Sequence, residues 1–453
     1  MRLKTAWFSP LPPQRSGIAD YCEDLLPWIA ETMDIDLFVE DPQVHLGTPL
    51  ARRFPIFGYL DYAGRRRQQG YDVCIYHMGN NLVHRFVYPA LVKNPGIVVL
   101  HEPMLHHFML EMLSAGWSRE DYSRELDYNY GVDRPDIEAM VEADTTERTR
   151  FQYPMLQRVA DSALGTIVHS SHAKDVLLRC SPPGPVEVIQ QSCFPEPGVP
   201  PRSRERARRS LGVPRESFLL GVFGFMTPAK MVYEVIEAFS SLLETCPGAR
   251  LVLAGGLNPA YPLDRAVSAP GTGGRVTVTG YTEMEELLLW MDACDLGIAL
   301  RNPSAGETPS SVLRLLGRGC PAVVSDHMAY REFPVEACPR IAPGREREQL
   351  PVMLRHLALH PGELQAMSTA ALAYAREFHH PSRAAELYRQ FALDLLSGRY
   401  EEAQPAGRYS LCGEAAGRLE KRVAGAWAGM GLPRGAEGIP SRVRDLIEGM
   451  MSR

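Results

Sequence analysis

Short runs of apolar residues alternate along the chain with longer segments in which apolar residues recur at helical spacing. The short runs are rich in β-branched and aromatic residues, which favours strands. Alternation of strands and helices is typical of parallel sheets that are covered by helices. The runs form two series, which predicts two doubly wound α/β domains rather than one barrel. The predicted strands of the first series are 5–10, 34–40, 71–79, 96–102 and 164–170, and those of the second are 218–224, 250–256, 276–281, 296–301 and 321–326.

The segments between and after these strands predict how the domains are connected. A Pro-rich approach leads into the Arg-rich residues 201–210, which we interpret as the interdomain connection running into the first helix of the second domain. Residues 105–161 show no strand signal, and we interpret them as a helical insertion on the side of the sheet where ligands usually bind. The chain is mostly helical from 326 to 399. Residues 401–453 are richer in Gly, Pro and Ala, which predicts a loosely packed extension with one helix near 442–451.

Composition and charge limit the classes of function. Hydrophobic residues make up 45% and charged residues 23% of the 453 residues, which is typical of a globular protein. The net charge of -6 argues against a dedicated nucleic-acid binder. No apolar run approaches the ~18–20 residues of a membrane span, and no secretory signal is visible. The nine cysteines are scattered without a CxxC pair, which fits a reducing cytosol, so we expect a cytoplasmic protein.

The Arg runs and a DxD-like pair of aspartates each allow both a functional and a purely structural interpretation. The runs Arg65–Arg67 and Arg202–Arg209 could bring the protein to anionic lipid headgroups at a membrane surface, whereas a solvated helix face and a linker are the simpler interpretation. Asp34 and Asp36 resemble a DxD metal motif. Because they lie in an alternating strand pattern, a solvated strand edge explains them, and we predict no metal site.

The segment from the strand 296–301 to Gly319 carries the clearest chemistry. Thr308 suits an N-cap position and Pro309 suits the first position of a helix. Ser310 and Ser311 would then place hydroxyl groups beside free backbone N–H groups. A helix N-terminus at the carboxyl end of a parallel strand can bind an anion, although an ordinary capped helix explains the pattern as well.

Three further loops follow predicted strands. Gly224 allows a close backbone approach, and we expect Lys230 in the first turn of the next helix, where a cation opposes the helix dipole and is better explained by a bound phosphate. Gly17 lies in the loop after the first strand and would let a ligand approach the backbone. His101 and Glu102 close the strand 96–100, and we expect His101 to lie at the ligand-binding edge.

Together these segments resemble the family 4 glycosyltransferases over most of residues 4–395. The order and spacing of the motifs carry the resemblance. The motifs are Ser9–Tyr21, Val99–His101, Thr166–Ser170, Gly224–Lys230, Val278–Tyr281 and Gly306–Asp326.

The resemblance implies the α/β GT-B fold, with two doubly wound Rossmann-like domains facing across a cleft and C-terminal helices crossing back. Residues 1–197, with the insertion 105–161, would form the acceptor-side domain. Residues 198–380 would form the domain that binds the nucleotide sugar, and residues 381–453 would form the crossover helices and the extension.

The resemblance also implies an activity. The protein would transfer a sugar from a nucleotide-diphosphate donor, UDP- or GDP-linked, to an acceptor with retention of anomeric configuration. The acceptor could be a glycan, a lipid-linked molecule, a small molecule or a protein, and no further cofactor is implied. Glu307 would contact the sugar and His101 would contact it from the opposite domain. The donor-binding residues implied by the resemblance are Gly17, Gly224, Lys230, Thr308, Ser310, Ser311 and Arg314.

Some positions depart from the family pattern of two Glu residues eight positions apart. Gly306 and Arg314 occupy those positions, and Glu307 would substitute for the first Glu from one residue away. Phe225 stands where the family has an Arg. Arg314 would either add positive charge to the phosphate site or point to solvent. These departures leave two alternatives open, namely a non-catalytic or regulatory GT-B protein and another GT-B enzyme such as an epimerase.

Overall fold

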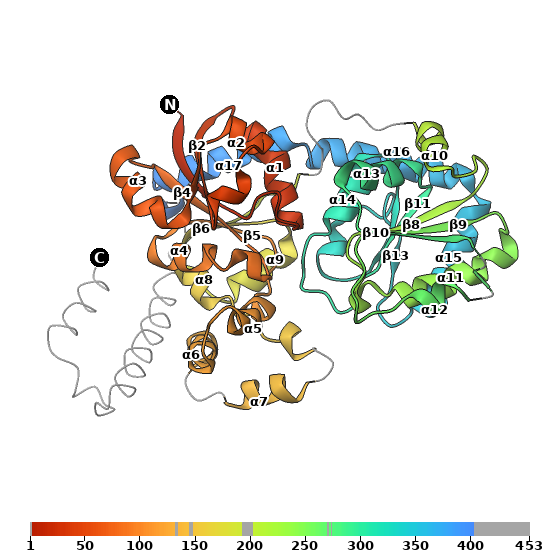
Figure 1. The fold of residues 1–453 in the computed structure, drawn as a ribbon, viewed down its shortest axis with the longest axis horizontal. Helices are drawn as coiled ribbons and strands as arrows, with labels where there is room; N and C mark the ends of the chain where they lie inside the picture. Colours follow the sequence, from red (N-terminus) through yellow and green to blue (C-terminus); the bar gives the residue numbers. More distant parts are fainter. Residues whose placement is uncertain are drawn as a thin grey trace.

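Two parallel β-sheets, each covered by helices, form the two lobes of the molecule (Figure 1). The structure is a computed structural model, and it describes residues 2–131, 135–144, 148–192, 203–269, 271–272 and 274–402. The extension and the helix that the sequence predicts beyond residue 402 lie outside the described residues. No helix in the described part of the chain combines the length and the apolar character that crossing a bilayer requires.

The first domain is built on a seven-stranded sheet in the order β3-β2-β1-β4-β5-β6-β7. Both faces of the sheet are buried, because Phe8 packs in the apolar cluster on one face and its neighbour Trp7 packs in the cluster on the other. The strands are β1 (Leu3–Phe8), β2 (Met33–Val39), β3 (Ile56–Gly58), β4 (Val73–Met78), β5 (Gly96–Leu100), β6 (Ala163–Val168) and β7 (Val186–Val188). The covering helices include α1 (Gly17–Ile29), α2 (Pro49–Arg53), α3 (Tyr62–Gln69), α4 (Val87–Lys93) and α9 (Ser171–Leu178).

The second domain is built on a six-stranded sheet in the order β10-β9-β8-β11-β12-β13. Its strands also alternate between two cores, with Leu219 on one face and Leu220 on the other. The strands are β8 (Leu219–Phe223), β9 (Arg250–Ala254), β10 (Val276–Gly280), β11 (Leu296–Ala299), β12 (Ala322–Ser325) and β13 (Arg340–Ile341). The helices are α10 (Arg204–Leu211), α11 (Val232–Thr245), α12 (Asp264–Val267), α13 (Met284–Ala293), α14 (Ser310–Gly317), α15 (Glu346–Leu359) and α16 (Pro361–Phe378).

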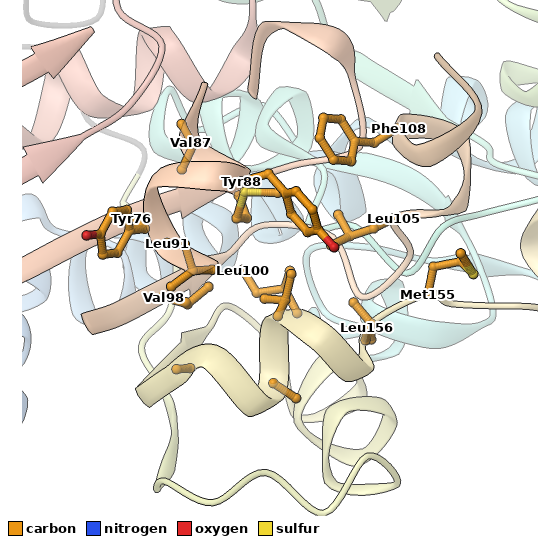
Figure 2. Close-up of a cluster of buried hydrophobic side chains, with 14 of the residues drawn as sticks. Tyr76, Val87, Tyr88, Leu91, Val98, Leu100, Leu105, Phe108, Met155 and Leu156 are labelled. Carbon is orange, nitrogen blue, oxygen red and sulfur yellow. The ribbon is translucent and has the colours of Figure 1, made fainter. Parts of the chain in front are cut away.

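The stretch 105–161 consists, in its described part, of helices that extend the core of the first domain. They are α5 (His106–Ser114), α6 (Arg119–Tyr130), α7 (Pro135–Ala143), a short 3-10 helix (Thr149–Phe151) and α8 (Gln157–Ser162). Figure 2 shows how Leu105, Phe108, Met155 and Leu156 approach Tyr88 of α4 within one buried apolar cluster. The stretch is therefore packed onto the sheet through a shared core.

The chain crosses back to the first domain after α16. Helix α17 (Pro381–Leu396) lies against α1, where the hydroxyl groups of Tyr388 and Tyr21 are 2.9 Å apart. The junction of α16 and α17 is fixed by buried His379, whose Nδ1 lies 2.7 Å from the carbonyl oxygen of Gln191. The predicted α/β fold class, with two doubly wound domains and helices crossing back, is confirmed.

Candidate active site

The topology places the predicted site residues where doubly wound sheets bind ligands. In each sheet the strand order reverses direction at one point, between β1 and β4 in the first and between β8 and β11 in the second. Ligands bind beyond the carboxyl ends of the strands at such a point. The two points face each other, because a Cβ atom on Gly17 at the start of α1 would lie 3.7 Å from Oγ of Ser310 at the start of α14 (Figure 1).

Further contacts join the domains around this point. The guanidinium of Arg15, in the loop after β1, stacks 3.9 Å from the ring centroid of Tyr281, which follows β10. The backbone N–H of His172 donates to the Glu332 carboxylate at 3.0 Å. The structure therefore shows the two domains in contact along the predicted ligand-binding edge.

The loop after β8 folds Lys230 back over Gly224. The Lys230 ammonium donates to the carbonyl oxygen of Phe223 at 2.5 Å, and a Cβ atom on Gly224 would lie 3.4 Å from that ammonium. Gly224 has a φ of 91°, which favours glycine. Burial and then Arg301 lower the pKa of Lys230, and Glu307 opposes them, so that the pKa is about 7. A partly buried cation whose charged form is disfavoured in this way is suited to a ligand that brings negative charge.

The helix after Lys230 begins later than the sequence predicted. Lys230 ends a 3-10 turn (Pro228–Lys230), and α11 begins at Val232. Met231 between them adopts a left-handed conformation with a φ of 54°, which is rare for a residue with a side chain and recurs at functional sites. The expectation that Lys230 lies in the first helical turn is wrong by two residues, so its electrostatic environment comes from Arg301 and Glu307 more than from a helix dipole.

Helix α14 leaves its first backbone N–H groups without a side-chain cap. The N-cap residue is Pro309, whose carbonyl oxygen accepts from Val312 N at 3.0 Å, and no side chain caps the helix. The expected N-cap, Thr308, therefore lies one residue before the observed one, because the extended backbone of Pro309 puts it outside the helix. Ser310 and Ser311 form the first turn, as predicted, and their side chains are only partly buried.

Glu307 is bound within its own loop. Its Oε1 accepts from Arg301 Nε at 2.6 Å, and its Oε2 accepts from Ser304 Oγ and Ala305 N, both at 2.9 Å. These bonds hold the carboxylate beside Arg301, which lies at the carboxyl end of β11. The structure thus places Glu307 at the predicted site, with the guanidinium of Arg301 as its main partner.

Position 306 could not carry the Glu of the family pattern. Gly306 has a φ of 78°, and a Cβ atom there would lie 2.8 Å from Pro103 and 3.0 Å from His172, both in the first domain. Glycine replaces the Glu of the family pattern at this position because the first domain lies too close for a side chain.

Glu102 faces this loop from the first domain. It is partly buried, and its pKa is raised by burial and by the Glu307 carboxylate, while Arg301 and a hydrogen bond with Asn80 oppose the shift. The amide oxygen of Asn80 accepts from Phe108 N at 2.9 Å, which leaves its NH₂ group to donate to Glu102. Two carboxyl groups and two cations thus meet where the domains touch.

His101 lies beneath this surface in a chain of three buried histidines. Its Nε2 is 2.9 Å from His77 Nδ1, and its Nδ1 is 3.2 Å from His169 Nε2. The chain ends at the carbonyl oxygen of Ile189, 2.8 Å from His169 Nδ1. Since a carbonyl only accepts, His169 Nδ1 carries a proton, and each neutral ring then donates from Nδ1 to the next.

The hydrogen bonds among the three histidines bear on the expectation that His101 contacts the transferred sugar. Both of its ring nitrogens are engaged by other histidines, and burial lowers its pKa well below the ordinary value, with His169 and His77 adding to the effect. The structure places His101 next to the interdomain surface but exposes only 8% of it. The neighbouring Glu102 is the residue of this strand end that reaches the second domain.

Arg314 crosses between the domains. Its Nη2 donates to Oδ2 of Asp24 on α1 at 2.9 Å, and the two side chains are 8% and 16% exposed. Of the two alternatives for Arg314, the one in which its side chain points to solvent is therefore wrong. Asp20, also on α1, has a pKa raised by burial, which Arg314 opposes and Asp24 and Glu283 reinforce. Nη1 of Arg314 is buried and has no hydrogen-bond partner among the described residues, so part of the guanidinium remains available to a ligand.

The Arg runs and the DxD-like pair take part in ion pairs within the fold. Arg208 is buried and donates to Asp295 Oδ2 at 2.5 Å. Arg65 pairs with Asp36 at 3.2 Å, and Asp34 pairs with Arg2 at 2.6 Å. These contacts give the two motifs a structural explanation in the part of the chain that is described.

Sequence reasoning missed three residues of this site. Glu102 and Arg301 were predicted only as the ends of strands. A charged residue at the carboxyl end of a buried strand can indicate a ligand-binding site, and this pattern would have identified both. Asp24 gave no signal, because it is one of several polar residues on an amphipathic helix whose partner lies 290 positions away.

Comparison with known proteins gives a family match for part of the second domain and several similar folds. Residues 203–337 match the family model described as "Glycosyl transferases group 1". No curated protein matches the sequence. Sucrose-phosphate synthase from Thermosynechococcus elongatus is similar in structure, with a TM-score of 0.61 and 14% identity over 88% of this chain and 100% of that one.

Two more solved structures show the same fold. HepE from Anabaena, solved in complex with UDP, has a TM-score of 0.60 and 14% identity over 86% of this chain and 99% of its own. WaaG, described as a glycosyltransferase involved in lipopolysaccharide biosynthesis, has a TM-score of 0.56 and 15% identity over 84% of this chain and 99% of its own. Residues 203–337 are therefore similar to the group 1 glycosyltransferases, and the chain shares the two-domain α/β fold of these solved structures. The family match supports the expected enzyme class, a glycosyltransferase.

Proposed function

We propose that this protein transfers a sugar from a nucleoside-diphosphate donor to an acceptor held by the first domain, with retention of anomeric configuration. One observation carries the proposal: the Lys230 ammonium, the Arg301 guanidinium and the uncapped start of α14 converge beside Glu307, at the point where the strand order of the second sheet reverses. HepE, a structural neighbour, has been solved with UDP and with UDP-glucose, which supports a nucleotide-sugar donor here.

Each residue would have a distinct part in holding the donor. Lys230 and the backbone N–H groups of Ser310 and Ser311 would bind the diphosphate and stabilise the charge that develops as it leaves. Arg301, held by Glu307, would supply the cation that the family pattern places at position 225. Gly17 and Gly224 would let the donor approach the backbone, and Thr308 would border the phosphates.

The reaction would need no dedicated protein base. The bond between the anomeric carbon and the β-phosphate oxygen breaks, and the acceptor oxygen bonds to the same face of that carbon. The acceptor proton passes to the departing phosphate. Glu102, kept neutral by its surroundings, would donate a hydrogen bond to the reacting sugar or phosphate, and the histidine chain would hold the strand end that carries it.

A non-catalytic nucleotide-binding protein is the second candidate. It is favoured by the bonding of both Glu307 oxygens within the 301–307 loop, because these bonds engage the carboxylate that would contact the sugar. Binding of a nucleotide sugar without transfer or hydrolysis would be its signature.

The donor is tested by thermal unfolding in the presence of UDP, GDP, ADP and TDP and of their sugars. We expect one nucleotide family to raise the unfolding temperature, because a ligand that binds the folded state stabilises it by mass action. The same sugar nucleotide should then be turned over when acceptors are supplied. Stabilisation without turnover would favour the second candidate, and no stabilisation by any nucleotide would contradict both.

The role of Glu102 is tested by Glu102→Gln and Glu102→Ala. A glutamine amide imitates a neutral carboxyl group, so Glu102→Gln should keep kcat/KM within a few-fold at neutral pH. The alkaline side of its pH profile should become less steep, because only the fall caused by Lys230 remains. Glu102→Ala should lose about ten- to hundredfold in kcat/KM, the value of one hydrogen bond to a charged group. Loss of activity in both variants, with nucleotide binding intact, would show that Glu102 acts as an ionised base instead.

A further inference from the structure

Two histidines and a glutamate gather on the surface where α15 meets α16. His356 lies in the last turn of α15, His360 lies between the helices, and Glu363 lies in the first turn of α16; all three are exposed. His356 Nε2 is 2.9 Å from Glu363 Oε2. The two imidazole rings stack with centroids 4.1 Å apart. One ligand atom of each residue lies within 4.8 Å of the others, which is the only such group of three among the described residues.

A backbone hydrogen bond prepares His360 as a ligand. Its Nδ1 lies 2.7 Å from the carbonyl oxygen of His356 and donates to it, so the proton of the neutral ring is on Nδ1. Nε2 therefore presents a lone pair. Metal-binding histidines usually donate their second ring nitrogen in this way, because the bond fixes both the tautomer and the ring orientation.

We propose that His356, His360 and Glu363 bind a divalent transition-metal ion of the zinc class. Two imidazole nitrogens and one carboxylate oxygen suit zinc, whereas Mg²⁺ and Ca²⁺ prefer oxygen ligands throughout. With metal–ligand bonds of about 2.0–2.1 Å, the ligand atoms of a tetrahedral site lie roughly 3.3 Å apart. The His356–Glu363 pair is already close to that spacing, and the metal would replace the hydrogen between them. The three ligand atoms lie within 4.8 Å of one another, so rotation of the exposed His356 and Glu363 side chains toward His360 would close the site, and the fourth position would be open to water.

The proposed ion would fasten the junction between two helices that cover the second sheet. Helix α15 packs against α11, and α16 packs against α14, where Ser368 donates to the carbonyl oxygen of Gly319. Since none of the three ligands belongs to the proposed donor site, the metal site stands or falls independently of the proposed function.

The test is zinc binding by the full chain, measured by calorimetry and by the shift in unfolding temperature with ZnCl₂ or MgCl₂. We expect a zinc site that His360→Ala and Glu363→Gln each weaken at least tenfold, since even outer-shell changes cost about 10–100-fold at such sites. His107→Ala is the matched control, because His107 Nε2 pairs with Glu111 at 3.2 Å and the described residues offer this pair no third ligand. This variant should bind zinc as the unaltered protein does.

Three results would overturn the proposal. One is the absence of zinc binding, and another is equal zinc affinity in the unaltered chain and in both ligand variants, which would place the ion on thiols elsewhere. The third is stabilisation by MgCl₂ equal to that by ZnCl₂, which would indicate a non-selective ionic effect. All three ligands are exposed, so circular dichroism should show unchanged folding in the variants.

Discussion

Raising the pH from 7 to 9 will weaken the binding of a nucleoside diphosphate, and Lys230→Met will abolish that dependence. Burial, reinforced by Arg301, lowers the pKa of Lys230 to about 7, so near neutral pH a large share of the free protein carries an uncharged amine there. A bound diphosphate favours the ammonium and raises this pKa. The affinity of the protein should therefore fall by up to tenfold per pH unit above 7, until the pKa of the bound state is reached.

Removal of the amine has a second effect. A charge-assisted hydrogen bond contributes about 1.5–3 kcal/mol, so Lys230→Met should weaken diphosphate binding about ten- to hundredfold at pH 7. Its affinity should then be nearly constant up to pH 9, a range in which the second phosphate ionisation, near pH 6, is complete.

Calorimetry in two buffers of different ionisation enthalpy measures the protons taken up on binding. The unaltered protein should take up a fraction of a proton at pH 7 and approach one near pH 8, and Lys230→Met should take up none. Lys93→Met is the matched control, because Lys93 is exposed at the end of α4. Affinity that stays constant from pH 7 to 9 in the unaltered protein would remove Lys230 from the diphosphate site.

The protein should lose stability steeply as the pH falls below 6.5. Seven histidines are buried among the described residues, and burial lowers the pKa of each; for four of them the value is about 4. They are His45, His77, His84, His101, His106, His169 and His379. Above pH 6.5 these rings are neutral in both the folded and the unfolded state, so they have no effect on the pH dependence there.

Below pH 6.5 the unfolded chain takes up protons that the folded protein does not. Each buried histidine therefore lowers the free energy of unfolding by about 1.4 kcal/mol per pH unit between its unfolded pKa and its folded pKa. For a ring with a folded pKa of about 4, the loss is about 2 kcal/mol at pH 5. Several such rings together approach the 5–15 kcal/mol that stabilise a typical domain.

Urea unfolding between pH 7.5 and 4.5 measures this loss. His84→Gln should reduce the slope of stability against pH by close to one proton, because buried His84 titrates only in the unfolded state, while glutamine keeps a donor for Asn81. His380→Gln is the control variant, because the His380 side chain is only partly buried. A free energy of unfolding that is constant from pH 6.5 to 5 would contradict the prediction.

The strands could be predicted from the sequence because a strand that is buried on both faces appears as a short run of apolar residues. All ten predicted strands are present. The three that were missed, Ile56–Gly58, Val186–Val188 and Arg340–Ile341, have two or three residues, which is too short for any period to show. These short strands form because a neighbouring strand offers free hydrogen-bonding groups. That neighbour is distant in the sequence, so a local pattern cannot reveal the pairing.

The site residues also fall into a group that local sequence reveals and a group that it does not. Gly224, Lys230 and Ser310 were recognisable because loop, glycine and helix start are close in sequence. Helix starts were displaced by one or two residues, since the backbone of Pro309 and of Met231 decides the boundary and the residue types alone do not. The pair of Arg314 with Asp24 could not be foreseen, because only the packing of one domain against the other brings α1 and α14 together.

The return of α17 to the first domain has a consequence for synthesis of the protein on the ribosome. Tyr388, Phe391 and Ala392 belong to the same apolar cluster as Trp7 and Ile75 of the first sheet. The domain whose strands are made first thus lacks part of its core until the whole second domain has been translated. A nascent chain arrested before residue 381 should expose the part of one face of the first sheet that α17 covers, where a chaperone could bind, while the second domain is already able to fold. The first domain is therefore translated before the second domain, but its core is completed after it.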